Sequence, residues 1–306
     1  MPAFSTHYLF AKEMIPIVEE KMHTKLDRNA VMIGAQGPDI FFFHRAFPWQ
    51  KGKTLRSAGS IMHRSKCGDI VDRFRKHMET QGFSEISQSY IYGFLMHYAL
   101  DRTCHPYVYF MQDVITDKFK RMNPKSVHNM IEASIDSVMI NRIENEDKPR
   151  AFNTENTFNY TQDELLIASS VIESASEIVS PIKYSQSDAA TAIEDTKAAQ
   201  KIMNDKNGRK HACLDIAEKI VAPITKNFKI SSFLRTDDLE NAYKYVNIYN
   251  RGWKSPFGGN IRRESFFDLF EKSKSDALDM IIGFEKGLTG FDITRNISFL
   301  TGVELK

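Results

Sequence analysis

The chain has 306 residues, of which 42% are hydrophobic and 26% are charged, and its formal net charge is +2. This composition is typical of a soluble globular protein, and the chain is long enough to bury a sizeable core. The near-neutral charge gives no indication of a broad basic surface for a membrane, and no nucleic-acid groove is evident.

The start of the chain and its cysteines predict a cytoplasmic protein. The first residues, MPAFSTHYLFAKE, lack the basic start, apolar run and cleavage site of a secretory signal peptide. No apolar stretch approaches the roughly 18 residues of a transmembrane helix. The three cysteines are odd in number and form no CxxC pair, which argues against a disulfide framework.

The first 80 residues are predicted to contain two helical regions separated by a loop. Residues 8–22 have helical spacing, and Pro16 is expected to kink or end the first part. Residues 27–60 hold several glycines and prolines and the aromatic run IFFFHRAFPW, so they are predicted to be mainly loop with a short helix near Ala30. Residues 60–80 return to helical character.

The middle of the chain carries the most apolar predicted helix, over 87–105. It is expected to end near His105, because the residue before Pro106 is pushed away from helical geometry. Residues 126–143 are amphipathic and predict another helix. The polar segment 144–160 is expected to be a linker or a long surface loop.

The last 146 residues continue the helical pattern. Thr161 and Glu164 form a capping-box pattern that opens a helix through about residue 178. Further helices are predicted over 187–205, 209–228 and 263–286, the last stopped by Gly287, and residues 251–260 are predicted to be a loop. No segment alternates with period two, so the predicted fold class is all-α.

Histidines and carboxylates occur at metal-ligand spacing on two of these helices. His97, Asp101 and His105 fall at i, i+4 and i+8, which places them on one stripe of a helix. His128 and Glu132 repeat the i, i+4 relation on the second helix. Ligands one helical turn apart can converge on one zinc ion, and an aspartate can bridge two ions.

A lone HxxxE or HxxxD pair is more often a surface hydrogen-bonded pair, and a lone histidine in an apolar helix is more often a satisfied core residue. Two such pairs within forty residues, one of them in a helix that looks buried, favour a metal cluster, because unpaired ionisable groups are costly to bury. Three upstream residues are further candidate ligands: His7, Asp39 and His63. Cys104 is expected to be a core residue.

The order of these residues resembles the zinc-dependent phospholipase C family, which includes secreted bacterial phospholipases and the catalytic domain of clostridial alpha-toxin. The resemblance covers about residues 1–140 and rests on His7, on Asp39 in GPD, on His63, and on the blocks HYALDRTCHP and HNMIE. It implies a single all-α domain over 1–306, a multi-helix bundle with a metal cluster between helices. Residues 1–140 would form the metal-ligand region, and residues 161–290 would supply supporting helices.

The resemblance also implies two to three zinc ions. One would be held by Asp39, His63, His97 and Asp101, a second by His105, His128 and Glu132, and a third by His7 with Asp101 as a bridge. In the secreted members the third ion also takes an N-terminal tryptophan. This chain begins Met1-Pro2, so the His7 site is expected to bind its ion most weakly.

The resemblance implies a zinc-dependent phosphodiester hydrolase of the phospholipase C type. A metal-activated water would attack the phosphate of a phospholipid or a related small phosphodiester, with Asp39 as the catalytic residue that orients or deprotonates the water. A zinc nuclease or nucleotidase is the alternative enzyme, because the same cluster serves either substrate. A non-catalytic metal-binding protein that retains the ligands is the alternative from another class.

Overall fold

The computed structural model describes residues 4–306, and its regular structure is helical throughout this range. Two isolated β-bridges, Trp253 to Arg262 and Ile297 to Glu304, are the only β-pairs in it. The all-α prediction is therefore confirmed. The α-helices are α1 (Phe4–Met22), α2 (Arg28–Ala35), α3 (Ile40–Phe43), α4 (Arg56–Met62), α5 (Cys67–Gln81), α6 (Glu85–Lys118), α7 (Pro124–Glu144), α8 (Gln162–Ser174), α9 (Gln186–Met203), α10 (Arg209–Thr225), α11 (Leu239–Ala242), α12 (Phe266–Glu285) and α13 (Gly290–Thr294).

Short 3-10 helices connect several of these elements. They are η1 (Gly37–Asp39), η2 (Pro149–Ala151), η3 (Thr154–Thr157), η4 (Ser176–Val179), η5 (Ser231–Phe233) and η6 (Tyr243–Tyr245). No helix of the described residues is long and apolar enough to cross a membrane.

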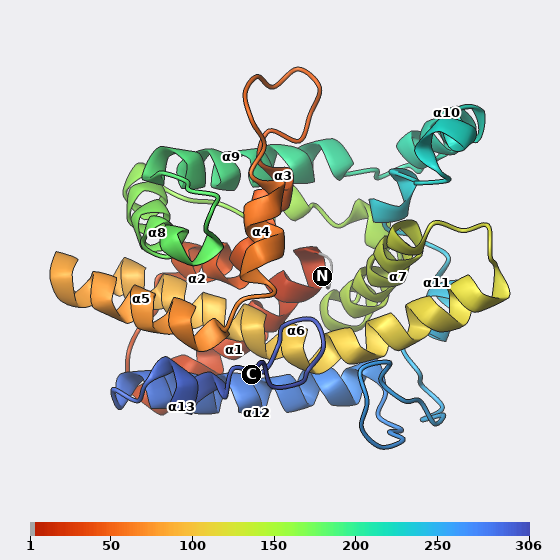
Figure 1. Cartoon of the computed structure of the whole chain (residues 1–306). Helices are drawn as coiled ribbons and strands as arrows, with labels where there is room; N and C mark the ends of the chain where they lie inside the picture. The colour runs from red at the N-terminus through yellow and green to blue at the C-terminus, as the bar shows by residue number, and fades with distance from the viewer. Residues whose placement is uncertain (1–3) are drawn as a thin grey trace.

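The 34-residue helix α6 crosses the middle of the molecule (Figure 1). A reciprocal capping box between Ser84 and Ser87 starts it, and its side chains are buried almost without interruption from residue 89 to residue 108. Helix α2 packs closely on α6 at two glycines. A Cβ on Gly93 would lie 2.2 Å from the carbonyl oxygen of Val31, and a Cβ on Gly34 would lie 2.0 Å from that of Tyr90.

The structure confirms most of the predicted helices. The segments 8–22, 126–143, 187–205, 209–228 and 263–286 are helical, with ends shifted by a few residues, and segment 60–80 is helical except for a break at 63–66 between α4 and α5. The helix that begins after Thr161 has the predicted capping box, and it ends at Ser174 with η4 carrying the chain to Val179. Gly287 follows α12 with φ +74°, as the stop signal predicted.

The prediction that a helix ends near His105, before Pro106, was wrong, and of the two outcomes expected at Pro16, a kink or a helix end, the helix end does not occur. Helix α1 continues through Pro16 to Met22, and α6 continues through Pro106 to Lys118 instead of ending near His105. A proline inside a helix removes one hydrogen bond, but the burial of both faces of α6 outweighs that loss. Gly302 packs directly on the turn of α6 that contains Pro106. A Cβ at this position would lie 2.8 Å from Pro106 Cγ and 2.9 Å from the carbonyl oxygen of Arg102, so a larger residue would not fit.

The prediction of mainly loop over 27–60 was also wrong. The short helix near Ala30 exists as α2, but η1, α3 and α4 add further turns, and only the stretch 44–55 is loop. Segment 144–160 contains η2 and η3 and is held against the body by Phe158, whose buried ring lies 5.6 Å from that of Phe4. The loop at 251–260 is confirmed, and the bridge between Trp253 and Arg262 closes it.

The second half of the chain packs as helices against the first half. Helix α12 runs along α6, and α8 packs on α5 and α6. The chain then returns after α13 so that Phe299 lies in the core with its ring 4.7 Å from that of Tyr98. This return brings the C-terminal residues next to the stripe of α6 that carries His97, Asp101 and His105.

Candidate metal centre

Helix α6 places three candidate ligands on consecutive turns of one buried stripe. His97 Nε2 lies 3.2 Å from Asp101 Oδ2, and His105 Nδ1 lies 3.7 Å from Asp101 Oδ1. All three side chains are fully buried. The predicted i, i+4, i+8 stripe is therefore present, with the aspartate between the two imidazoles.

Two further candidate ligands lie beside Asp101, Asp39 from the region predicted to be mainly loop and His63 from the region predicted to be helical. Asp39 ends η1, and His63 is the C-cap residue of α4. His63 Nε2 lies 3.1 Å from Asp39 Oδ1 and 3.5 Å from Asp101 Oδ2. The turns η1 and α4 thus position one carboxylate and one imidazole over the middle of α6.

His7 approaches the same aspartate from α1. Its Nε2 lies 3.3 Å from Asp101 Oδ1, and its ring stacks on that of His97 with 4.2 Å between centroids. Asp136 of α7 fixes the first turn of α1 by accepting hydrogen bonds from the backbone N–H groups of Ser5 at 3.0 Å and Thr6 at 2.8 Å. A carboxylate at a helix N-terminus also offsets the dipole, so Asp136 anchors the turn that carries His7.

A second group lies on the far side of His105. His128 Nε2 is 3.0 Å from Glu132 Oε1, and His105 Nε2 is 3.9 Å from the same oxygen. Both His128 and Glu132 stand on α7, one turn apart, as the sequence predicted. His128 is the most exposed of the eight candidate side chains, at 13%.

The structure therefore brings all eight candidate ligands together between α1, α4, α6 and α7. Three sets have donor atoms within 4.8 Å of one another: His7 with Asp39 and His97, His63 with His97 and Asp101, and His105 with His128 and Glu132. The third set coincides with the second zinc site implied by the resemblance. The first two sets draw on the other five residues, with His97 in both. Met1 and Pro2, on which the weak binding at His7 was argued, lie outside the described residues.

Four of the histidines are held by their Nδ1 atoms so that Nε2 faces the cluster. Nδ1 lies 2.8 Å from the carbonyl oxygen of Gly59 for His63, 3.1 Å from that of Ala35 for His97 and 2.8 Å from that of Phe299 for His105. For His128 the partner is the Gln112 side-chain oxygen at 2.9 Å. This arrangement is typical of metal-binding histidines, because it fixes the tautomer that leaves a lone pair on Nε2.

The inward-facing atoms are buried without hydrogen-bond partners among the described residues. They are Nε2 of His7, His63, His97 and His105, Oδ1 of Asp39 and both carboxylate oxygens of Asp101. Buried polar atoms are nearly always hydrogen-bonded, so such a cluster of orphaned donor atoms needs another explanation. A divalent cation satisfies them together, and the nitrogen and oxygen donor set fits zinc.

Burial keeps the outer imidazoles neutral. It lowers the pKa of His105 to about 3, and it holds the pKa of His128 well below its usual range. Burial and the neighbouring His97 also lower the pKa of His7. Burial raises the pKa of Glu132 well above its usual range. Neutral imidazoles are the protonation state that binds a metal.

The centre of the cluster keeps a negative charge. Burial alone raises the pKa of Asp101, but the imidazoles of His105 and His97 hold it well below its usual range. Burial alone lowers the pKa of His63, but the carboxylates of Asp101 and Asp39 raise it to about 9. A buried anion surrounded by nitrogen donors favours a cation at the same place.

Gly37 and Phe299 shape the walls of the cluster. Gly37 has φ +49°, and a Cβ there would lie 2.5 Å from Cδ2 of His97. The GPD turn therefore needs glycine, both for its backbone conformation and for the space that the imidazole occupies. The ring of Phe299 lies 5.4 Å from that of His63 and closes the cluster on an apolar side.

Several supporting residues were not predicted from the sequence. Asp136 extends the stripe of His128 and Glu132 by one helical turn in the sequence, but this spacing does not predict its hydrogen bonds to Ser5 and Thr6. The carbonyl groups of Ala35, Gly59 and Phe299 could not be predicted either, since a backbone acceptor leaves no mark on the sequence. Cys104 is buried, and burial raises its pKa, so the prediction that it is a core residue is confirmed.

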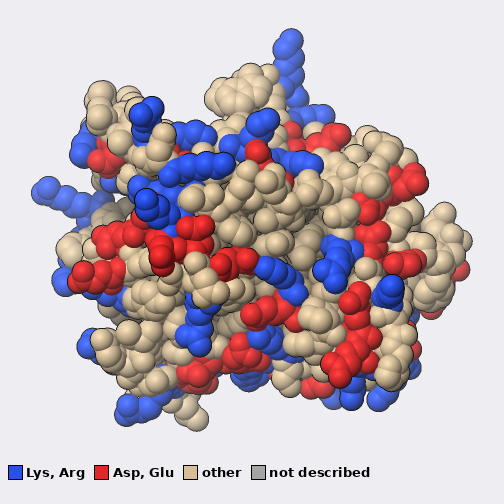
Figure 2. Space-filling model, turned by 180° about the vertical axis from the view of Figure 1, so that it is seen from behind, with Lys and Arg blue, Asp and Glu red and all other residues tan. Residues whose placement is uncertain are grey.

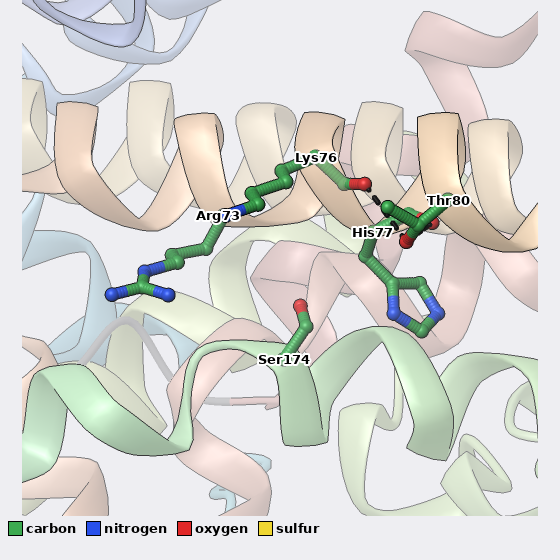
Figure 3. A pocket seen from close by; sticks show the side chains of 5 residues that line it. All are labelled: Arg73, Lys76, His77, Thr80 and Ser174. Carbon is green, nitrogen blue, oxygen red and sulfur yellow. Dashed lines mark hydrogen bonds between the residues drawn. The ribbon is translucent and has the colours of Figure 1, made fainter.

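A surface hollow elsewhere on the molecule is not part of this centre. It has a volume of about 180 Å³ and lies between α5 and α8, lined by Arg73, Lys76, His77, Thr80 and Ser174 (Figure 3). Arg73 already pairs with Glu177 at 2.7 Å, and no carboxylate lines the hollow. None of the eight clustered residues reaches it.

Of three comparisons with known proteins, the one with family models gives a match. No curated protein and no solved structure matches the chain. A family model described as zinc-dependent phospholipase C matches residues 6–183, a range that contains all eight clustered residues. Because this match spans more than half of the 306 residues, the chain belongs to the zinc-dependent phospholipase C family.

Proposed function

We propose that this protein is a zinc-dependent phosphodiester hydrolase that acts on a phospholipid or a related small phosphodiester. Membership in the family supports phosphodiester hydrolysis at the level of the family. The observation that carries the proposal for this chain is the cluster of buried, orphaned donor atoms around Asp101. A stable fold without a metal function would avoid this arrangement, because each unpaired buried polar group costs about 1–3 kcal/mol.

In this proposal Asp39, His63, His97 and Asp101 hold one zinc ion, and His105, His128 and Glu132 hold a second. His7 binds a third ion together with Asp101, which serves as the bridge. The contacts of both Asp101 oxygens support the bridge, since Oδ1 faces His7 at 3.3 Å and Oδ2 faces His97 at 3.2 Å.

Bound zinc supplies a Lewis acid for the phosphate oxygens and lowers the pKa of a coordinated water toward neutrality. The chain's own residues fix the geometry. The Nδ1 contacts orient the imidazoles, and Phe299 excludes water from one side of the cluster. Asp39 orients or deprotonates the attacking water through its carboxylate. His128 is the most exposed of the eight side chains, so the substrate approaches from its side.

A small substrate is favoured over a polynucleotide by the charge pattern. The net charge is only +2. On the face seen in Figure 2, Lys and Arg side chains are interspersed with Asp and Glu. Phosphate backbones are bound mainly by cations that line one groove, whereas most of the cations on this face are mixed with carboxylates. A nuclease or nucleotidase, and a non-catalytic metal-binding protein, are therefore treated as outcomes of the test below.

The test combines metal analysis with an assay panel. Protein purified with zinc should carry two to three ions per chain and hydrolyse phosphocholine esters and bis-nitrophenyl phosphate faster than single-stranded DNA. His105→Ala should lose metal and turnover, whereas His211→Ala, outside the cluster, should keep both. Less than one ion per chain after zinc supplementation would overturn the proposal. Full metal without turnover would favour the non-catalytic protein, and faster cleavage of DNA would favour the nuclease.

A further inference from the structure

Helix α10 turns its apolar side outward. Ile216, Ile220 and Ile224 stand at i, i+4 and i+8, so they form one stripe, and Ile220 and Ile224 are 76% and 85% exposed. The only side chain of α10 that is buried is a carboxylate, that of Glu218, which accepts hydrogen bonds from Ser231 N at 2.7 Å and Ser231 Oγ at 2.6 Å. An ordinary surface helix has the opposite polarity.

The loop over 44–55 presents a second apolar tip. Trp49 is 67% exposed and stacks on Phe47 with 4.9 Å between ring centroids. The base of the loop is fixed, because Asp195 accepts hydrogen bonds from Arg45 N and from the Gln50 side chain. The hydrogen bonds at the base of the loop therefore fix the position of the Trp49 indole, which exposes a large apolar surface to water.

Both tips project from the same edge of the molecule. Figure 1 shows the loop at the top and α10 at the upper right, and Figure 2 shows the same upper edge from behind. In the view of Figure 1 both segments lie on the upper side of the molecule. We call Phe47, Trp49, Ile216, Ile220 and Ile224 the apolar edge.

Exposed cations flank the apolar edge, and the neighbouring carboxylates are already engaged. The exposed cations are Lys51 and Lys53 beside Trp49, and Arg209, Lys210, Lys219, Lys226 and Lys229 around α10. Asp215 pairs with Lys219 at 2.8 Å and with Lys229 at 3.2 Å, and Glu218 faces inward. The charge left around the apolar edge is positive, which complements an anionic surface.

We propose that the apolar edge docks the protein on the surface of an anionic phospholipid bilayer. Tryptophan prefers the interfacial region of a bilayer, and a helix with an aliphatic stripe flanked by lysines binds in the plane of that region. Anionic headgroups attract the nearby cations and so strengthen the binding. The inference deepens the proposed function and rests on it, since docking of this kind presents bilayer phospholipid as the substrate.

The test measures vesicle binding and turnover separately. Zinc-loaded protein is floated with vesicles of phosphatidylcholine alone or with 30% phosphatidylglycerol, a composition of about one anionic lipid in three. Turnover is measured on bis-nitrophenyl phosphate, which needs no bilayer. The wild type should bind the anionic vesicles and bind less in high salt. Trp49→Ser should weaken binding severalfold, and Ile220→Ser with Ile224→Ser should weaken it at least about tenfold, with unchanged turnover.

Matched controls are available outside the apolar edge. Phe83 is 66% exposed, and Ile261 is also exposed, so Phe83→Ser and Ile261→Ser remove comparable surface and should bind vesicles like the wild type. No binding by the wild type, or equal weakening in the controls, would overturn the docking inference while leaving bis-nitrophenyl phosphate turnover intact. A dimer in sedimentation that Ile224→Ser dissociates, without vesicle binding, would identify a second copy as the occupant instead. Binding without turnover would count against the proposed function alone.

Discussion

Asp101 is the residue on which the two halves of the cluster depend. Oδ1 faces His7 and His105, and Oδ2 faces His63 and His97, at distances between 3.2 and 3.7 Å. The side chain is fully buried, and neither oxygen has a hydrogen-bond partner among the described residues. A carboxylate in this position is stable only beside positive charge, which is the physical reason for proposing that Asp101 bridges two cations.

The first prediction concerns Asp101→Asn. The amide has one oxygen and no charge, so it cannot bridge two cations, and the variant should lose more than one ion per chain. Phosphodiesterase activity should fall by more than about a hundredfold, because the metals carry the chemistry. Elemental analysis and bis-nitrophenyl phosphate assays give the measurement. Asp117→Asn, at an exposed position of the same helix, is the control, and full metal in Asp101→Asn would refute the bridge.

At this scale the sequence predicted which candidate side chains lie close together, but not the backbone groups that orient them. Spacing of four residues placed His97, Asp101 and His105 on one stripe, because helical periodicity is a local property. The Nδ1 contact of His105 with Phe299 spans 194 residues, and it depends on the return of the chain after α13. Such a contact follows from tertiary packing alone, so no local pattern could predict it.

At the scale of elements, tertiary packing overrode some local sequence signals. Pro106 is a sound local stop signal, but α6 is packed on several sides by α2, α7 and α12, and continuing the helix buries more surface. The region 27–60 was misjudged for a similar reason. Its glycines and prolines mark the ends of short turns, as with Pro38 in η1, and these turns become stable only when packed on the larger helices.

The second prediction concerns the contact of α2 with α6. Gly93→Ala places a Cβ 2.2 Å from the carbonyl oxygen of Val31, and backbone on both sides prevents local relief. The helices should move apart, lowering the free energy of unfolding by about 2 kcal/mol or more. Urea denaturation followed by circular dichroism measures this change.

Gly283→Ala is the matched control for Gly93→Ala, because it also lies inside a helix. Its Cβ would meet only the side chains of Ile293 and Leu288, at 3.3 and 3.4 Å. Those flexible side chains can shift, and alanine has the better helix propensity, so its stability should stay within about 1 kcal/mol of the wild type. Equal losses in both variants would show that the α2–α6 approach is not the cause.

At the scale of the whole molecule, we propose that the chain folds as one domain. The buried hydrophobic cluster draws residues from Phe4 through Phe299, and it includes members of α1, α6, α8, α9 and α12. The candidate metal centre shares α1 and α6 with this cluster, and its candidate ligands also come from η1, α4 and α7, with Phe299 of the C-terminal segment beside them. Metal ions bound at this centre should therefore couple the stability of segments that lie far apart in the sequence.

The last prediction is that metal removal lowers the stability of the entire chain in one transition. Each bound ion stabilises the native state by about 4 kcal/mol when its concentration is a thousand times Kd, so stripping two ions should lower Tm by at least about 10 °C. Trp253 is buried in the second half, and Trp49 is exposed in the first. In Trp49→Phe, tryptophan fluorescence therefore reports on Trp253 and on its packing against Tyr107 of α6, 5.2 Å between ring centroids, while circular dichroism reports on all helices. Both signals should shift together when chelator is added and return together with zinc. If the chelator shifted the helical signal and left the fluorescence transition unchanged, the packing of Trp253 on α6 would not depend on the metal, and the single coupled transition would be refuted.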